Sequence, residues 1–129
     1  LTQDVIHLGN LDARRDFTYV NDTVDGFLRA AQTDGIEGET FNLGVGSEIR
    51  IADLAAEILS LLHLEKEIEV TPVRLRPGKS EVQRLLSDNS RARERLDWMP
   101  RFGLRQGLAE TIDWITANLH LYRPERYQL

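Results

Sequence analysis

The sequence predicts one α/β domain, and three observations lead to this class. The 129 residues and their 41% hydrophobic content are enough for a single core but leave little room for two domains. Short runs rich in β-branched and aromatic residues predict a few strands, and longer stretches with apolar residues at helical spacing predict about four helices. There is no cysteine, so a disulfide framework and a thiolate metal site are excluded.

The first quarter of the chain predicts two strands and a helix. Asp4–Leu8 is a short strand candidate that a Gly-Asn turn signal stops, and Phe17–Val20 is a second strand candidate after an arginine pair. Asn21 or Asp22 is expected to cap the helix that follows. The helix carries apolar residues at helical spacing, which we expect to face the core: Val24, Phe27, Leu28 and Ala31.

The middle of the chain predicts a strand, a helix and another strand. Thr40–Gly44 is the next strand candidate, and the glycines after it permit a tight turn. Glu67–Thr71 alternates polar and apolar residues, as a half-buried strand does, and Pro72 ends it. Between these strands a broad apolar helix face is formed by Ile51, Leu54, Ala55, Ile58, Leu61 and Leu62.

The last third predicts a charged loop, a short extended piece and two helices. Arg74–Glu81 is the most polar connection in the chain, and Val82–Leu86 follows it as the extended piece. Asp88–Ser90 is a strong capping sequence for a helix that turns Ala92 and Leu96 inward. The final helix is expected over about Leu104–Leu119.

Charge and hydropathy exclude two classes of partner. The formal net charge is −5, whereas nucleic-acid-binding proteins usually carry a basic excess that neutralises phosphates. No apolar run approaches the ~20 residues that a membrane span requires, and no signal-peptide pattern opens the chain. We therefore expect a soluble cytoplasmic protein without nucleic-acid or membrane partners.

Three places carry groups that could converge on one anionic ligand: Arg15 beside Arg14, Asn42, and the loop that contains Arg76 and Glu81. A nucleotide diphosphate needs donors for its oxygens, and an arginine fork can satisfy two of them. The two adjacent hydroxyls of a ribose can both donate to one carboxylate. These residues are therefore the candidate substrate-binding set.

Each candidate also has a structural interpretation. Arg15 could form an exposed ion pair with Asp12 or Asp16, and the loop with Arg76 and Glu81 could be no more than solvated surface. Asn42 stands between apolar residues, so its amide needs partners if it is buried, and backbone groups could supply them. Composition alone leaves these alternatives open.

The sequence has no recognisable catalytic, cofactor-binding or metal-binding residues. No Gly-x-Gly-x-x-Gly turn follows a strand, so the dinucleotide-binding fingerprint is missing. No tyrosine is followed four positions later by lysine, and the three histidines, His7, His63 and His120, are too far apart for a metal-ligand spacing.

Five short motifs, each weak alone, resemble in order the carboxyl-terminal domain of extended short-chain dehydrogenases/reductases, the NAD-dependent epimerase/dehydratase family. They are Leu8-Gly9-Asn10, Arg15-Asp16-Phe17-Thr18-Tyr19-Val20 with Asp22, Phe41-Asn42-Leu43-Gly44, Arg76-Pro77 to Glu81-Val82, and Asp88-Asn89-Ser90 with Leu96-x-Trp98-x-Pro100. The loop with Arg76 most resembles that of nucleotide-sugar 4,6-dehydratases such as GDP-mannose 4,6-dehydratases. Residues 1–129 would then form the nucleotide-sugar-binding domain.

The resemblance implies roles for the candidate residues. Arg15 and Arg76 would bind the diphosphate, Glu81 the ribose, and Asn42 the phosphate or base. Such enzymes use NAD or NADP to oxidise the sugar at C4, and dehydratases then eliminate water across C5 and C6. The amino-terminal Rossmann domain, which would hold the cofactor and the catalytic Tyr and Lys, is absent from these residues.

Two hypotheses follow about what the chain does alone. If it is the substrate-binding piece of such an enzyme, we expect it to bind nucleotide sugars weakly, to bind no cofactor and to have no dehydratase activity. The competing hypothesis is a noncatalytic α/β interaction module. In either case strand edges such as Val5–Leu8 and Phe41–Leu43 could lack neighbours, and we expect self-association.

Overall fold

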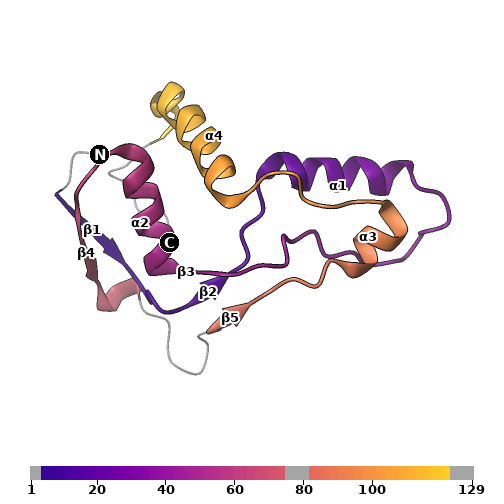
Figure 1. The fold of residues 1–129 in the computed structure, drawn as a ribbon, viewed down its shortest axis with the longest axis horizontal. Coiled ribbons are helices and arrows are strands. Elements are labelled where there is room, and N and C mark those ends of the chain that lie inside the picture. The colour runs from indigo at the N-terminus through magenta and orange to yellow at the C-terminus, as the bar shows by residue number, and fades with distance from the viewer. Residues whose placement is uncertain (1–3, 75–81, 123–129) are drawn as a thin grey trace.

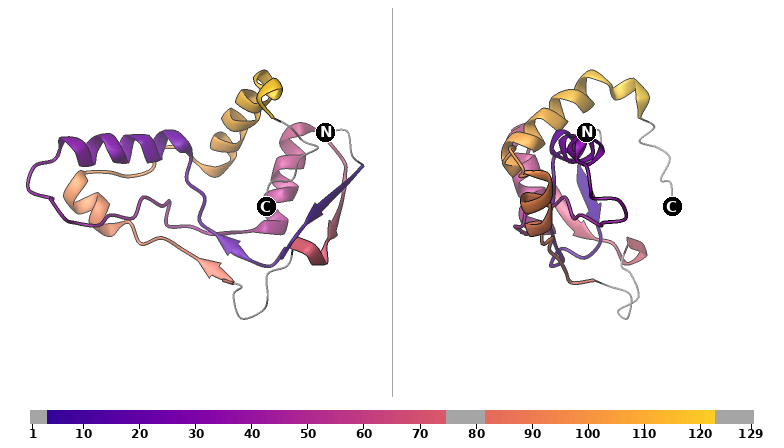
Figure 2. Two further views of the ribbon diagram at one scale, coloured as in Figure 1. Left: turned by 180° about the vertical axis from the view of Figure 1, so that it is seen from behind. Right: turned by 90° about the vertical axis from the view of Figure 1, so that its right-hand side faces the viewer.

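The computed structural model describes residues 4–74 and 82–122, which form an elongated α/β structure. The strands Val5–Leu8 and Glu67–Val70 and the helix Ile51–Leu62 lie at one end (Figure 1). The helices Val20–Gln32 and Ser90–Leu96 lie at the other end, and the helix Leu104–Ala117 lies between the two ends. The view from behind shows the same long outline, and the second view of Figure 2 looks along the length of the molecule. The predicted α/β class with four helices is confirmed. Among the described residues, no helix has the length and apolar character needed to cross a membrane.

Both sheets join segments that are distant in sequence. β1 (Val5–Leu8) pairs in parallel with β4 (Glu67–Val70). β2 (Arg14–Arg15) is the central strand of the second sheet, antiparallel to β3 (Ile49–Arg50) and parallel to β5 (Arg84–Leu85). The second sheet thus holds the arginine pair beside the strand that follows the charged loop.

The four α-helices are α1 (Val20–Gln32), α2 (Ile51–Leu62), α3 (Ser90–Leu96) and α4 (Leu104–Ala117). Short 3-10 turns follow β4 and α4, at η1 (Pro72–Arg74) and η2 (Leu119–Leu121). α2 ends at His63, which adopts the left-handed conformation (φ 53°) and donates its backbone N–H to the last turn. α1 and α3 lie together at the far end from β1 and β4.

The core is small and lies between α1 and α3. Ala92, Leu96 and Trp98 are buried there, and Phe41 and Leu43 are among the half-buried residues that pack against them. Trp98 is fully buried, and its indole N–H donates to the backbone carbonyl of Asp22 at 2.9 Å. The inward positions predicted for Ala92 and Leu96 are confirmed.

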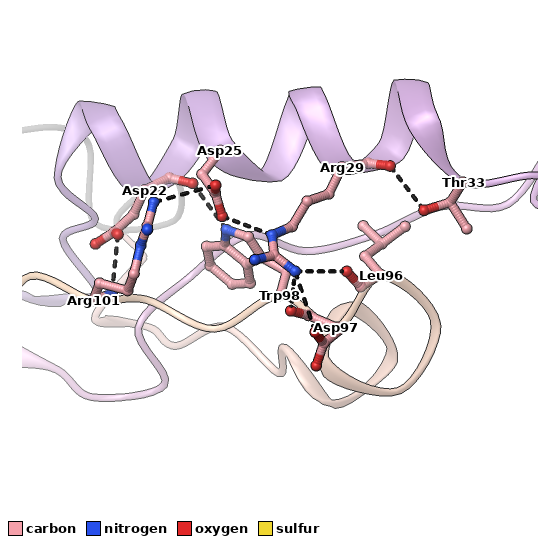
Figure 3. A network of polar contacts seen from close by, with 8 residues as sticks. All are labelled: Asp22, Asp25, Arg29, Thr33, Leu96, Asp97, Trp98 and Arg101. Carbon is pink, nitrogen blue, oxygen red and sulfur yellow. Dashed lines mark hydrogen bonds and ion pairs between the residues drawn. The ribbon is translucent and has the colours of Figure 1, made fainter.

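A buried carboxylate fixes α1 to the segment that enters α4. Asp22 is fully buried, and its oxygens accept the backbone N–H groups of Arg101 at 2.9 Å and Phe102 at 3.1 Å. Figure 3 shows this carboxylate and the neighbouring Arg29. The Arg29 guanidinium donates to Asp25 at 2.9 Å and to the carbonyl of Leu96 at 3.3 Å. These contacts hold the polar side of α1 against α3 and against the chain that follows α3.

Two predicted strands are wrong. Residues 17–19 belong to no strand, and Val20 already begins α1; Thr40–Gly44 likewise pairs with no strand among the described residues. Both segments have the residue types that favour strands, but a strand forms only where a second strand supplies hydrogen bonds. The predicted strand at Val82–Leu86 shortens to β5 for the same reason.

The predicted caps and inward face of the first helix are also wrong. The residue at the cap position is Tyr19, which makes no side-chain capping bond, and Asp22 lies inside the first turn. The apolar residues Val24, Phe27 and Leu28 point outward, whereas Asp22 and Gly26 are the buried residues of α1. Periodicity indicates that a helix has an apolar face but does not say which neighbour covers it.

Candidate functional site

The carboxylate of Asp16 holds three separate segments together just after β2. Its oxygens accept the backbone N–H groups of Val45 at 3.0 Å, Gly46 at 2.9 Å and Ser87 at 3.2 Å. Gly46 has φ 80°, a conformation that glycine adopts without strain and that turns its N–H toward the carboxylate. Asp16 therefore fixes the turn after Gly44 and the chain that leads into α3.

Two further residues keep the turn at Gly44 close to the chain that leads into α3. Asn89 is buried and donates its side-chain amide to the carbonyl of Gly44 at 2.6 Å. Gly44 is itself buried, and a methyl group in place of its hydrogen would overlap the side chain of Ser87. No other residue would fit at position 44 without separating the segments.

A hollow of about 420 Å³ opens beside this junction. Asn42 lies in its wall and donates its amide to the backbone carbonyl of Asp88 at 3.2 Å, while its side-chain oxygen points to no described partner. The wall is formed by Asp16, Thr18, Phe41, Asn42, Leu43, Gly44, Leu85, Leu86 and Ser87. The hollow thus offers an amide, hydroxyl groups and the Asp16 carboxylate beside apolar side chains.

Arg15 lies on β2, one residue before the Asp16 junction, and is not part of the wall of the hollow. Its guanidinium donates to the carbonyl of Arg14 at 2.8 Å and approaches that of Gln83 at 3.5 Å. Asp16 accepts the backbone N–H groups of Val45 and Gly46, and Asp12 approaches Arg50 at 3.5 Å, so both carboxylates considered as surface partners of Arg15 also contact other groups.

Arg76 and Glu81 lie outside the described residues, so their positions relative to Arg15 stay a prediction. The described part of the chain does place Arg15 opposite Leu85, because β2 and β5 run in parallel. Gln83, whose carbonyl the Arg15 guanidinium approaches, comes two positions after Glu81 in the sequence. Of the predicted substrate residues, the structure describes Arg15 on β2 and Asn42 in the wall of the hollow.

The other arginines of this sheet are occupied by carboxylates. Glu48 contacts Arg84 at 2.9 Å and Arg14 at 3.7 Å, which links neighbouring strands. The hydrogen bond to Glu48 raises the pKa of Arg84 above its ordinary value. In the same way the hydrogen bond between Arg50 and Asp53 raises the pKa of the guanidinium and lowers that of the carboxyl. These residues stabilise the sheet and are poor candidates for binding a ligand.

Sequence reasoning did not predict that Asp16 and Asn89 build the junction. It considered Asp16 as part of a family motif and as an ion-pair partner of Arg15, and Asn89 as part of the capping sequence Asp88–Ser90. A Gly-x-Gly turn downstream, at Gly44 and Gly46, was the available signal, because its exposed N–H groups need an acceptor. In the described residues no cluster of three His, Asp or Glu side chains converges to hold a metal ion.

In this small α/β unit, Asp16 fixes the strand with the arginine pair to the Gly-x-Gly turn and to the chain that leads into α3. This arrangement is that of the carboxyl-terminal domain of an extended short-chain dehydrogenase/reductase. The chain belongs to the GDP-mannose 4,6 dehydratase family, whose model matches residues 1–111. The resemblance seen in the motifs is thereby confirmed.

Relatives and solved structures agree with this family. The chain is 37% identical over 100 residues to UDP-glucose 4-epimerase of Mycolicibacterium smegmatis, covering 78% of this chain and 30% of that protein. The structure of RMD from Pseudomonas aeruginosa complexed with NADPH matches with TM-score 0.77 and 25% identity over 91% of this chain and 38% of that one.

A third match is UDP-glucose 4-epimerase with UDP-glucose from Thermotoga maritima, with TM-score 0.77 and 29% identity, covering 88% of this chain and 35% of that one. The chain thus spans about a third of the length of the proteins it matches.

Proposed function

We propose that this chain is the nucleotide-sugar-binding part of an NAD- or NADP-dependent nucleotide-sugar dehydratase or epimerase. The proposal rests on the pairing of β2 with β5, which holds Arg15 beside the strand that follows the Arg76 loop. It is supported by the match to an epimerase solved with UDP-glucose. The choice between dehydratase and epimerase belongs to residues outside this chain.

The chain's own residues would bind and orient the substrate. The Arg15 guanidinium carries donors that suit diphosphate oxygens, and Arg76 supplies a second fork. The Glu81 carboxylate would accept from the ribose hydroxyls, and the Asn42 amide would contact phosphate or base. The Asp16 junction would keep Arg15 and the hollow at Asn42 in fixed positions.

The residues of this chain do not fit a dinucleotide cofactor. A dinucleotide site needs a Gly-x-Gly-x-x-Gly turn between a strand and a helix, and the sequence does not contain this pattern. The shorter turn at Gly44 and Gly46 lacks the third glycine, and the backbone N–H groups of Val45 and Gly46 already donate to Asp16. We therefore assign the nicotinamide cofactor and the catalytic residues to a separate amino-terminal domain of the parent enzyme, and we expect the chain alone to be inactive.

Titration calorimetry with UDP-glucose and GDP-mannose tests the binding role. We expect weak binding to the wild type and a loss of about tenfold or more for Arg15→Ala and for Arg76→Ala, because a charge-assisted bond to phosphate contributes about 1.5–3 kcal/mol. Arg105→Ala is the control, since Arg105 pairs with Glu57 on the surface. Equal affinity in all four proteins, or no binding by the wild type, would refute the assignment.

The competing function, a noncatalytic interaction module, rests on the unpaired segment Thr40–Gly44. It predicts no nucleotide affinity and stable association with another chain. Light scattering over a wide concentration range, combined with the calorimetry, distinguishes the substrate-binding domain from the interaction module. A chain that stays monomeric and binds nucleotide sugars would contradict the interaction module.

A further inference from the structure

Three arginines stand side by side on one face of the sheet formed by β3, β2 and β5. Arg14 on β2 pairs in register with Arg50 on β3 and with Arg84 on β5. Like charges directly opposite each other on neighbouring strands destabilise a sheet. Arg50 has two carboxylates of its own, Asp53 at 3.0 Å and Asp12 at 3.5 Å. Arg14 and Arg84 therefore need another carboxylate.

Glu48 is the carboxylate that serves both of these arginines. It stands directly before β3, and its side chain is only 15% exposed. The Nε–H of Arg84 donates to both of its oxygens, at 2.9 and 3.1 Å, and Nη1 of Arg14 lies 3.7 Å away. Fully exposed ion pairs contribute little, but this carboxylate is largely withdrawn from water. Glu48 therefore holds together β2 and β5, whose arginines would otherwise repel each other.

Polar contacts hold β5 in place. β5 consists of two exposed residues at an edge of the sheet, and a strand without buried side chains gains little from packing. Two backbone bonds join it and the residue before it to β2, from the N–H groups of Arg14 at 2.8 Å and Asp16 at 3.0 Å. The Asp16 carboxylate also anchors the chain after β5 through its bond to Ser87. The bridge from Glu48 to Arg84 anchors the first residue of β5.

Arg15 lies between these two backbone bonds. Successive side chains of a strand point to opposite faces, so Arg15 projects from the face opposite the three arginines. Its guanidinium donates to the carbonyl of Arg14 on β2 at 2.8 Å and approaches that of Gln83, the residue before β5, at 3.5 Å. A displacement of β5 would therefore change the surroundings of the Arg15 guanidinium.

We propose that Glu48 is a positioning residue for Arg15, an inference that rests on the proposed function. Glu48 acts from the opposite face of the sheet: it fixes β5 against β2, and β5 in turn fixes the backbone and the guanidinium of Arg15. The nucleotide diphosphate then meets a guanidinium that is already ordered, and an ordered donor loses less entropy on binding. Glu48 thereby raises the affinity for the diphosphate without touching it.

The variant Glu48→Gln separates positioning from two simpler roles. By charge alone, removal of a carboxylate would strengthen the binding of an anionic ligand. Loss of sheet stability alone would leave the affinity unchanged under conditions in which the protein stays folded. Positioning predicts that UDP-glucose binding, followed by NMR chemical-shift titration on the folded protein, weakens by about two- to tenfold, the cost of ordering one flexible side chain.

A control and a double-mutant cycle show whether the effect passes through Arg15. Glu57→Gln is the matched control, because it removes the same charge from a carboxylate whose partner, Arg105, belongs to α4 and not to the sheet. In an Arg15→Ala background, Glu48→Gln should weaken binding no further. Unchanged or stronger binding by Glu48→Gln, or a loss that adds in full to that of Arg15→Ala, would overturn the proposal.

NMR of the free protein tests the link from Glu48 to Arg15 without a ligand. The guanidinium signals of Arg15, assigned by their loss in Arg15→Lys, report whether this group is held or rotates freely. We expect separate Nη–H signals in the wild type and averaged signals in Glu48→Gln, and identical signals in both would overturn the proposal. If the wild type binds no UDP-glucose while these signals still average in the variant, the proposed function alone is rejected.

A second variant keeps the test decisive if Glu48→Gln does not fold. Glu48→Asp retains the charge but shortens the side chain by one methylene, which withdraws the carboxylate from Arg84. We expect the same averaging of the Arg15 signals and weaker UDP-glucose binding, although the charge is unchanged. Wild-type signals and wild-type affinity in Glu48→Asp would contradict the positioning role.

Discussion

Replacing Asp16 by asparagine removes one acceptor from the junction of three segments. The carboxylate accepts three backbone N–H groups, with Gly46 and Ser87 sharing one oxygen and Val45 using the other. An asparagine can keep the shared oxygen, but its NH₂ group then faces the N–H of Val45. One charge-assisted bond is lost and one donor is left without a partner, which together cost about 2–4 kcal/mol of the free energy of unfolding.

Urea unfolding measured by circular dichroism provides the test. A loss of about 2–4 kcal/mol is a large part of the 5–15 kcal/mol that stabilises a typical domain, so the transition midpoint should fall clearly. Asp12→Asn is the matched control, because the Asp12 side chain is 83% exposed and only approaches Arg50 at 3.5 Å. A midpoint for Asp16→Asn within error of the control would refute the role given to this carboxylate.

Three further changes probe the same framework by urea unfolding. Gly44→Ala should cost about 1–3 kcal/mol, because the new methyl overlaps Ser87; an unchanged midpoint would contradict this. Trp98→Phe should cost about 2–4 kcal/mol, because it leaves the carbonyl of Asp22 without its donor and opens a cavity; a loss below about 0.5 kcal/mol would reject it. The backbone bond at the start of α3 lowers the pKa of Asp88, so its charge stabilises the fold above about pH 4 and not in stronger acid. The stability gap between wild type and Asp88→Asn should therefore close as pH falls; a constant gap from pH 6 to pH 2 would exclude this linkage.

The sequence predicted the helices better than the strands. α2 and α4 have apolar residues at helical spacing, and a helix makes its backbone hydrogen bonds within itself. Thr40–Gly44 has equally favourable residues for a strand, but a strand depends on a neighbour that no local pattern reveals. The orientation of α1 also escaped prediction, because the spacing of apolar residues does not say which face of a helix the rest of the chain covers.

The residue types of the candidate site could be predicted from the sequence, but the contacts that hold the site together could not. Arg15 and Asn42 stand out by chemistry, and both lie in motifs that resemble those of the family. Asp16 and Asn89 act through backbone groups that lie 29 to 71 positions away in the chain. Such partners become visible only when β2 and β5 are placed side by side.

The buried Asp22 carboxylate has a consequence for the order of folding. Its two acceptors meet N–H groups 79 and 80 positions later, so the polar side of α1 cannot reach its final environment until that part of the chain exists. A ribosome synthesises the chain from the amino terminus at about 5–20 residues per second, so α1 waits several seconds for its partners. During that interval the Asp22 carboxylate lacks the two backbone donors that hold it in the folded chain.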